Sequence, residues 1–117
     1  MNSFLAVAIG GAVGATLRFA ISEVIQTPWG TFTVNIIGSL LLGICMAGLA
    51  NELISKDLAI LLGTGLLGAF TTMSTFSLET VELWSDNPIH AIGYAGLTMV
   101  ICPLLALAGW KAVELTA

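Results

Sequence analysis

Polar side chains recur at helical spacing inside apolar stretches of this chain. Thr31, Asn35 and Ser39 are four residues apart in a segment whose only strongly polar residue is Asn35. Residues four apart lie on one face of an α-helix, so these side chains would form a polar stripe. An amide in hydrocarbon needs a hydrogen-bond partner. Either a neighbouring backbone satisfies Asn35, or Asn35 donates hydrogen bonds to a solute that passes along the stripe.

A second stripe has the same spacing near the end of the chain. Tyr94, Thr98 and Cys102 are again four residues apart, and Glu79 precedes them in an apolar segment. A carboxylate at membrane depth is costly unless it is hydrogen-bonded or close to the interface, and such residues are functional-site candidates by default. The two stripes and Glu79 therefore carry most of the functional information in the sequence.

The sequence offers no candidate residues for covalent catalysis. Cys45 and Cys102 fall inside apolar segments without CxxC or metal-site spacing, which favours apolar filling. His90 is the only histidine and stands at the mouth of the last apolar segment. No Ser/His/Asp or Cys/His combination is available, so we predict that the protein is not an enzyme.

The most unusual segment runs from Gly63 to Ser77. It contains three glycines and six hydroxyl residues within an apolar stretch. Glycine and threonine weaken a helix, so we predict a break between Gly68 and Ser74. Unwound backbone at membrane depth persists only when it is buried in protein or lines a polar cavity, and in transporters such breaks expose carbonyls that hold cations. The alternative is a continuous helix whose hydroxyls bond to its own turns.

These residues must be positioned by membrane-spanning helices. Of the 117 residues 57% are apolar and only 9% are charged, whereas soluble domains are about 25% charged. A span needs ~20 apolar residues, and four segments qualify. We predict an all-α membrane protein, one four-helix transmembrane domain over residues 1–117, with spans at about 4–22, 31–50, 58–84 and 89–110.

The orientation of these spans is weakly specified. Positive charges set membrane topology, and an even number of spans places Lys56 and Lys111 on one side and Arg18 on the other. The difference is one side chain (2 − 1 = 1). Either copies insert both ways up, or a partner or the insertion machinery fixes the orientation. No basic cluster invites nucleic acid.

Three motifs, in this order, connect the chain with a known family. They are Gly11-xx-Gly14-Ala15-xx-Arg18, the run WGTFTVNIIGS from Trp29 to Ser39, and Gly65-xx-Gly68-xx-TTMSTFS-x-Glu79. With these motifs the chain resembles the bacterial fluoride exporters called Fluc or CrcB, in length, number of spans and motif order. The resemblance implies a fluoride-selective channel of the bacterial inner membrane that passively exports fluoride. It also implies a dual-topology homodimer, whose two subunits lie antiparallel in the lipid.

The resemblance also implies roles for individual residues. Asn35 would donate to the ion, and Phe76 would offer the electropositive edge of its ring. A polar track of Ser74, Thr75, Glu79, Tyr94 and Thr98 would continue this route. We add Thr31 to this track. Arg18 would draw anions into a vestibule. Backbone carbonyls of Gly68 and Thr71 from both subunits would hold one structural Na⁺ on the twofold axis.

Two positions depart from the family pattern. Met73 stands where the family has the first of two phenylalanines, and Cys102 stands where a serine is expected. A thioether is polarisable and flexible, so we predict that Met73 lines the ion path and partly replaces the missing ring edge.

Two other classes of protein remain as alternatives. Small multidrug transporters also have four helices, but they resemble antiporters with an essential carboxylate midway along the first helix, and no acid precedes Glu23 here. A scaffold subunit without transport activity would explain the small residues but would leave Asn35 and the hydroxyl-rich break without a purpose.

Overall fold

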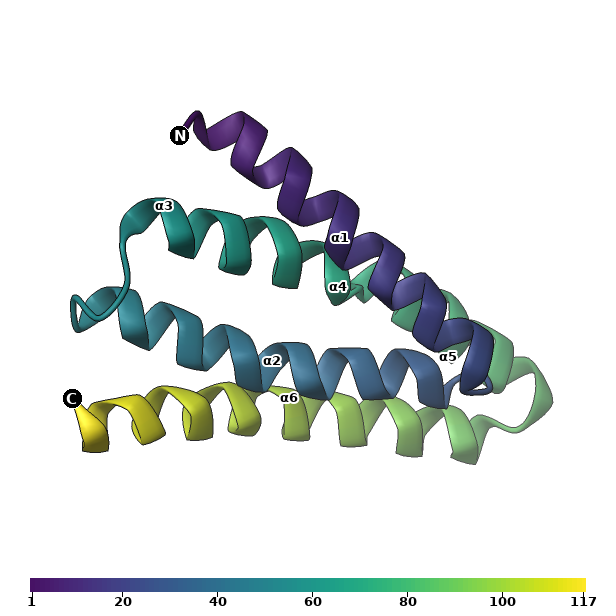
Figure 1. Cartoon of the computed structure of the whole chain (residues 1–117). Helices are drawn as coiled ribbons and strands as arrows, with labels where there is room; N and C mark the ends of the chain where they lie inside the picture. The colour runs from purple at the N-terminus through teal and green to yellow at the C-terminus, as the bar shows by residue number, and fades with distance from the viewer.

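Four long apolar helices make up the computed structural model, which describes residues 1–117 (Figure 1). The first two are α1 (Ser3–Val24) and α2 (Trp29–Ala50). The third is divided into α3 (Lys56–Ala59), η1 (Ile60–Leu67), α4 (Gly68–Phe70) and α5 (Met73–Asp86). The fourth is α6 (Pro88–Thr116). Each is long and apolar enough to cross a membrane, which confirms the predicted all-α class with four spans.

Polar side chains cap the N-termini of the helices. The Asn2 side chain accepts from the Phe4 amide at 2.8 Å, and that of Asn87 accepts from the Ile89 amide at 3.1 Å. Such caps satisfy amides that have no partner inside the helix. At its other end α6 continues past the predicted limit at Trp110, through Lys111 and Glu114, which form an ion pair at 3.0 Å. The apolar pattern had marked the end of the span, and the helix itself extends beyond it.

Glycines allow close helix contacts in two places. α2 lies along α6, where a Cβ on Gly43 would collide with the carbonyl oxygen of Ala106. α1 crosses η1, where a Cβ on Gly14 would collide with the carbonyl oxygen of Leu66. Small residues are what membrane helices use to bring their backbones together. The two contacts give two helix pairs, and Figure 1 shows α1 diverging from α2 towards the N-terminus.

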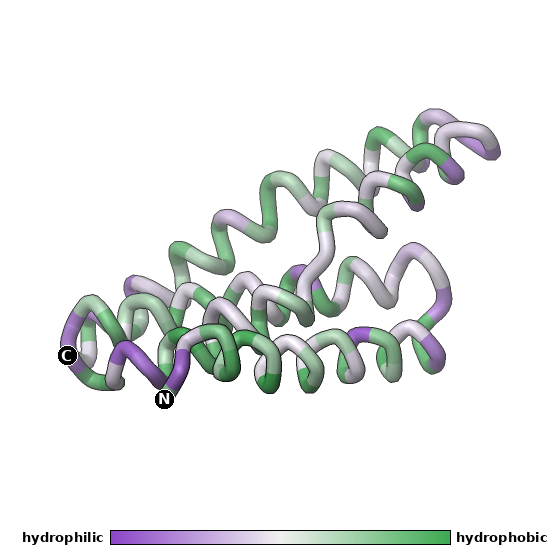
Figure 2. The backbone as a smooth tube through the Cα atoms, turned by 90° about the horizontal axis from the view of Figure 1, so that it is seen from above, coloured by the Kyte–Doolittle hydropathy of each residue, from purple (hydrophilic) through white to green (hydrophobic).

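The outer surface is apolar, as a lipid-facing surface must be. Hydrophobic colouring follows most of the helices, and hydrophilic colouring gathers mainly at the connections and chain ends (Figure 2). Large side chains such as Phe4, Leu78 and Ile92 are exposed. The buried hydrophobic cluster is small and consists of Val34, Leu67 and Phe70. Because lipid is as apolar as leucine, such a protein does not hide its large side chains inside.

The third helix is broken where the sequence predicts. Thr71 and Thr72 are extended, with φ/ψ of −86°/157° and −152°/120°, between the end of α4 at Phe70 and the start of α5 at Met73. A continuous helix is therefore excluded, although Thr71 does donate back to the Leu67 carbonyl at 3.1 Å. The π-helical turn η1 was not predicted. Its wider hydrogen-bonding pattern is rare and occurs often at functional sites.

Candidate functional site

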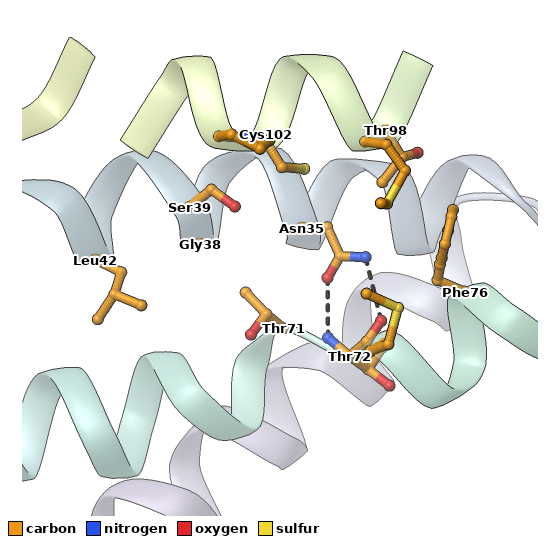
Figure 3. A pocket seen from close by; sticks show the side chains of 12 residues that line it. Asn35, Gly38, Ser39, Leu42, Thr71, Thr72, Phe76, Thr98 and Cys102 are labelled. Atoms are coloured by element: carbon orange, nitrogen blue, oxygen red, sulfur yellow. Dashed lines mark hydrogen bonds between the residues drawn. The ribbon is translucent and has the colours of Figure 1, made fainter. Parts of the chain in front are cut away.

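Asn35 holds the break from the side of α2. Its Oδ1 accepts from the Thr72 amide at 2.9 Å, and its Nδ2 donates to the Thr72 carbonyl at 3.2 Å (Figure 3). The first of the two alternatives for Asn35, pairing with a neighbouring backbone, is therefore observed. An amide nitrogen carries two N–H donors, so one N–H remains for another partner.

Arg18 holds the other end of the same break. Its Nε donates to the carbonyl of Ala69 at 3.0 Å, in the last turn before the chain unwinds. A cation at the end of a helix satisfies carbonyls that have no partner in the helix. Arg18 also borders a small cavity of about 110 Å³ together with Thr31, Thr72 and Thr75.

A second cluster surrounds Glu79. Thr31 Oγ1 donates to Glu79 Oε2 at 3.0 Å, and the Tyr94 hydroxyl donates to Glu79 Oε1 at 3.1 Å. All three side chains are buried, with 7% of Glu79 exposed, and they come from α2, α5 and α6. Each carboxylate oxygen has one hydroxyl donor, and neither ion pair of the chain involves Glu79. We call these three residues the Glu79 cluster.

A hollow of about 370 Å³ lies beside the break, between α2, α5 and α6 (Figure 3). We call it the central hollow. Its lining consists of Asn35, Gly38, Ser39, Leu42, Thr71, Thr72, Met73, Phe76, Thr98, Met99, Cys102 and Pro103. No lysine or arginine lines it. Four of the residues predicted for the ion route thus meet in one place: Asn35, Met73, Phe76 and Thr98.

Thr98 is the one buried side chain of the helices whose hydroxyl has no hydrogen-bond partner. Thr33 and Thr80, for example, donate to the carbonyls four residues before them at 2.8 Å. Thr98 is 6% exposed, and its Oγ1 has no hydrogen-bond partner. A buried polar atom without a partner costs about 1–3 kcal/mol, so this hydroxyl is a candidate for pairing with a ligand or with a second copy.

An aromatic contact connects the two sites. Phe76 lines the central hollow, and its ring centroid lies 5.3 Å from that of Tyr94 in the Glu79 cluster. Trp29 packs on Tyr94 in turn, at 6.2 Å and nearly perpendicular. Aromatic rings in such arrangements present their positive edges to neighbours.

Ser74 and Thr75 lie elsewhere than in the central hollow. Both are within hydrogen-bond distance of Thr72 Oγ1, Ser74 at 3.3 Å and Thr75 at 3.2 Å, in the first turn of α5. Thr72 also caps the helix, since its Oγ1 accepts from the Thr75 amide at 3.2 Å. Sequence reasoning missed this role of Thr72, although a threonine directly before a helix start is a capping signal.

Gly68 and Thr71 bracket α4. Helix ends leave their last carbonyls without intrahelical partners. Thr71 supplies a donor to Leu67, and Arg18 supplies one to Ala69, but no side chain donates to the carbonyl oxygens of Gly68 or Thr71. Gly68 is also exposed. Carbonyl oxygens are suitable ligands for a hard cation such as Na⁺, so the residues present fit that ion chemically.

Comparisons with known proteins place the sequence among one group. The family described as CrcB-like protein, Camphor Resistance (CrcB), matches residues 5–110. A protein of Idiomarina loihiensis named fluoride-specific ion channel FluC is 43% identical, over 85% of this chain and 82% of its own length. Proteins of the same name from Thermotoga maritima and Methylobacillus flagellatus are 42% and 40% identical, over 79% and 99% of this chain and 79% and 98% of their own.

Proposed function

Because this chain belongs to the CrcB-like family, we propose that it is a fluoride-specific ion channel that lets fluoride leave the cytoplasm passively and so protects against fluoride toxicity. The observation that carries the proposal is the central hollow, because it gathers an amide donor, a free hydroxyl and an aromatic ring. A relative of about the same length as this chain carries the name fluoride-specific ion channel FluC. The four apolar helices place the protein in a membrane, which we take to be the bacterial inner membrane.

The chemistry of the central hollow suits fluoride. Fluoride is small and strongly hydrated, so a channel must replace its water with donors and must not trap it with a fixed positive charge. Asn35 has one N–H to spare, Thr98 has an unpaired hydroxyl, and the Phe76 ring lies beside them in the lining. No cationic side chain lines the hollow. An ion could therefore be bound weakly enough to move on.

Arg18 and the Glu79 cluster extend this proposal in two directions. Arg18 borders the small cavity near Thr31 and Thr75, where its charge would attract anions. Ser74 and Thr75 would contribute hydroxyls at the start of α5. Glu79 and Tyr94 would continue the polar route beyond Phe76, since the Phe76 and Tyr94 rings are in contact. These assignments are part of the proposal.

We further propose that two copies assemble antiparallel. Met73 lines the central hollow and is 64% exposed, so one side of the site is open in a single copy. A second copy would close it, and the charge difference of one side chain between the two membrane faces permits both orientations. The free carbonyls of Gly68 and Thr71 from both copies would then hold one Na⁺ on the twofold axis.

The channel function is tested by measuring fluoride and chloride efflux from liposomes with ion-selective electrodes. We expect fluoride to run down its gradient without a pH gradient and chloride hardly to move. Efflux that requires a pH gradient would favour a proton-coupled transporter, and equal rates for both ions would exclude a fluoride-specific channel. No efflux from correctly assembled protein would favour a scaffold.

The antiparallel arrangement is tested by labelling. A single cysteine introduced near the N-terminus, in a chain without Cys45 and Cys102, should react with impermeant reagent from both sides of the membrane in comparable amounts. Labelling from one side alone would exclude dual topology while leaving the efflux result unaffected.

A further inference from the structure

Three sulfur-bearing side chains line the central hollow. Met73 comes from the start of α5, and Met99 and Cys102 come from the middle of α6. Met73 and Cys102 are 29 positions apart in the sequence. The fold nevertheless brings their sulfur-bearing side chains to the same site.

Sulfur ligands of these types select soft metal ions. Thiolate and thioether groups prefer monovalent copper and similar soft cations, whereas carboxylate and water ligands suit hard ions. We propose that the central hollow binds a soft monovalent cation of the Cu⁺ and Ag⁺ class through the Cys102 thiolate and the thioethers of Met73 and Met99. On binding, the Cys102 thiol loses its proton to water, the sulfur–metal bond forms, and no oxidation is required.

The side chains have the freedom that such a site needs. Methionine has three rotatable bonds and adapts to its contacts, and Met73 and Met99 are 64% and 58% exposed. Cys102 is half-buried on the side of α6 that faces Ser39 and Asn35 (Figure 3). No lysine or arginine lines the hollow to repel a cation.

Thr98 is a further polar residue in the lining of the hollow. It lies one turn before Cys102 on α6 and lines the same hollow. Its hydroxyl is buried and has no hydrogen-bond partner in the chain.

The second cysteine provides a control within the same chain. Cys45 does not line the central hollow; its sulfur lies beside Gly63 of η1, two helical turns beyond Gly38 along the same face of α2. It is half-buried like Cys102. A soft cation that binds to any accessible thiol would therefore respond to both cysteines, whereas the proposed site depends on Cys102 alone.

The binding test uses the purified full-length protein in detergent and Ag⁺ in chloride-free nitrate buffer, followed by calorimetry and by the ultraviolet absorption of the sulfur–metal bond. We expect saturable binding of about one Ag⁺ per chain. Even an outer partner of a metal ligand is worth about 10- to 100-fold in affinity, so Cys102→Ser should weaken binding at least as much. Cys45→Ser should leave the affinity unchanged.

The methionines are tested with Met73→Phe and Met99→Leu, which remove the thioethers and keep apolar bulk. Each should weaken Ag⁺ binding and leave the protein assembled on a sizing column. Met73 is exposed and Cys102 is only half-buried, so Cys102→Ser and Met73→Phe should both leave the protein folded. The proposal is overturned by binding that survives Cys102→Ser, by equal loss in Cys45→Ser, or by methionine variants with unchanged affinity.

Transport supplies a second readout, and this part alone rests on the proposed function. A cation in the central hollow would occupy the fluoride route, so Ag⁺ should slow fluoride efflux from liposomes of the unmodified chain and not of Cys102→Ser. Undiminished efflux with Ag⁺ bound would overturn the placement of the cation in that route. A protein that binds Ag⁺ through Cys102 but moves no fluoride in its absence would instead refute the channel and leave the metal site standing.

Discussion

The Glu79 cluster and the central hollow are neighbours that treat their polar groups in opposite ways. In the cluster, Thr31 and Tyr94 each donate to one oxygen of Glu79, and all three side chains are buried. In the hollow, Thr98 is equally buried but its hydroxyl has no partner. The two sites share helices α2, α5 and α6 and meet at the contact between Phe76 and Tyr94. A closed network thus stands next to an open one.

The difference separates a structural task from a transport task. Polar groups that are paired within the chain hold helices together, and removing one partner destabilises the fold because the other is left buried without a hydrogen bond. Groups left unpaired cost stability and are retained where a ligand satisfies them. Asn35 lines the central hollow but combines both behaviours: its amide is paired with the Thr72 backbone, and one N–H is left without a partner.

The largest effect is expected at Asn35. Asn35→Leu removes both bonds to Thr72, which leaves a backbone amide and a carbonyl unpaired at a cost of about 1–3 kcal/mol each. We expect fluoride efflux to be abolished and the melting temperature to fall. Ser39→Ala is the matched control, since Ser39 lines the same hollow one turn after Asn35 and does not contribute to the bonds with Thr72. Equal stability of the two variants would show that the break does not depend on Asn35.

The Glu79 cluster should respond next. Glu79→Ala leaves the hydroxyls of Thr31 and Tyr94 without their acceptor, so we expect a destabilisation of about 2–3 kcal/mol. Glu79→Gln keeps a planar group that can pair with both hydroxyls and should restore most of that stability. Thermal unfolding in detergent, followed by the amount of assembled protein, measures both variants. An alanine variant as stable as the original chain would mean that the network does not hold the helices.

The sequence alone predicts much of this arrangement, for reasons that particular residues show. The apolar segments predict four spanning helices because a membrane demands length and hydropathy from each. The break at Thr71 and Thr72 is predictable because glycines and hydroxyl residues are concentrated in one segment. The polar stripe on α2 is also foreseeable, since Thr31 and Asn35 share one helix face.

Other features depend on contacts that no local pattern encodes. The bond from Arg18 to the Ala69 carbonyl joins α1 to α4 across a tertiary contact, and the pairing of Asn35 with Thr72 joins α2 to the break. The π-helical turn η1 has no composition that distinguishes it from an α-helix in the sequence. The roles that we assign to the individual residues in fluoride movement, the dimer and the Na⁺ remain proposals that rest on the family.

The contact between the two sites is tested at Phe76. Phe76→Ile removes the ring that lies against Tyr94 and lines the hollow, while it keeps an apolar side chain. If the ring edge serves the ion, efflux should fall several-fold, up to about tenfold, without loss of assembly, because an aromatic contact is worth about 0.5–1.5 kcal/mol.

Met73→Phe is the matched change at the open side of the same hollow. It introduces the ring that the resemblance to the fluoride exporters leads us to expect there, at an exposed position, and should keep transport. Should Phe76→Ile lower assembly and efflux in parallel, the ring would only be packing the helices, and the closed and open sites would no longer be distinct in function.

The smallest and sharpest effect is expected from a pair of threonines. Thr31→Val and Thr98→Val remove a hydroxyl from two equally buried side chains and replace it with a methyl group of similar size. Thr31 donates to Glu79 at 3.0 Å, so its loss leaves a carboxylate oxygen without a donor and should cost about 1–3 kcal/mol. Thr98 makes no bond in the chain, so its loss should cost no stability and even increase it slightly, because an unpaired buried hydroxyl disappears. The effect on efflux should not follow the effect on stability. Thr98→Val should slow fluoride efflux several-fold in a protein that melts no earlier, because only the passing ion loses a hydrogen-bond partner. A Thr98→Val protein with unchanged efflux and raised stability would show that the hydroxyl has no ligand. A Thr98→Val protein that melts earlier would show that the hydroxyl is paired within the assembled channel, and the contrast between the two sites would then be a feature of the single chain alone.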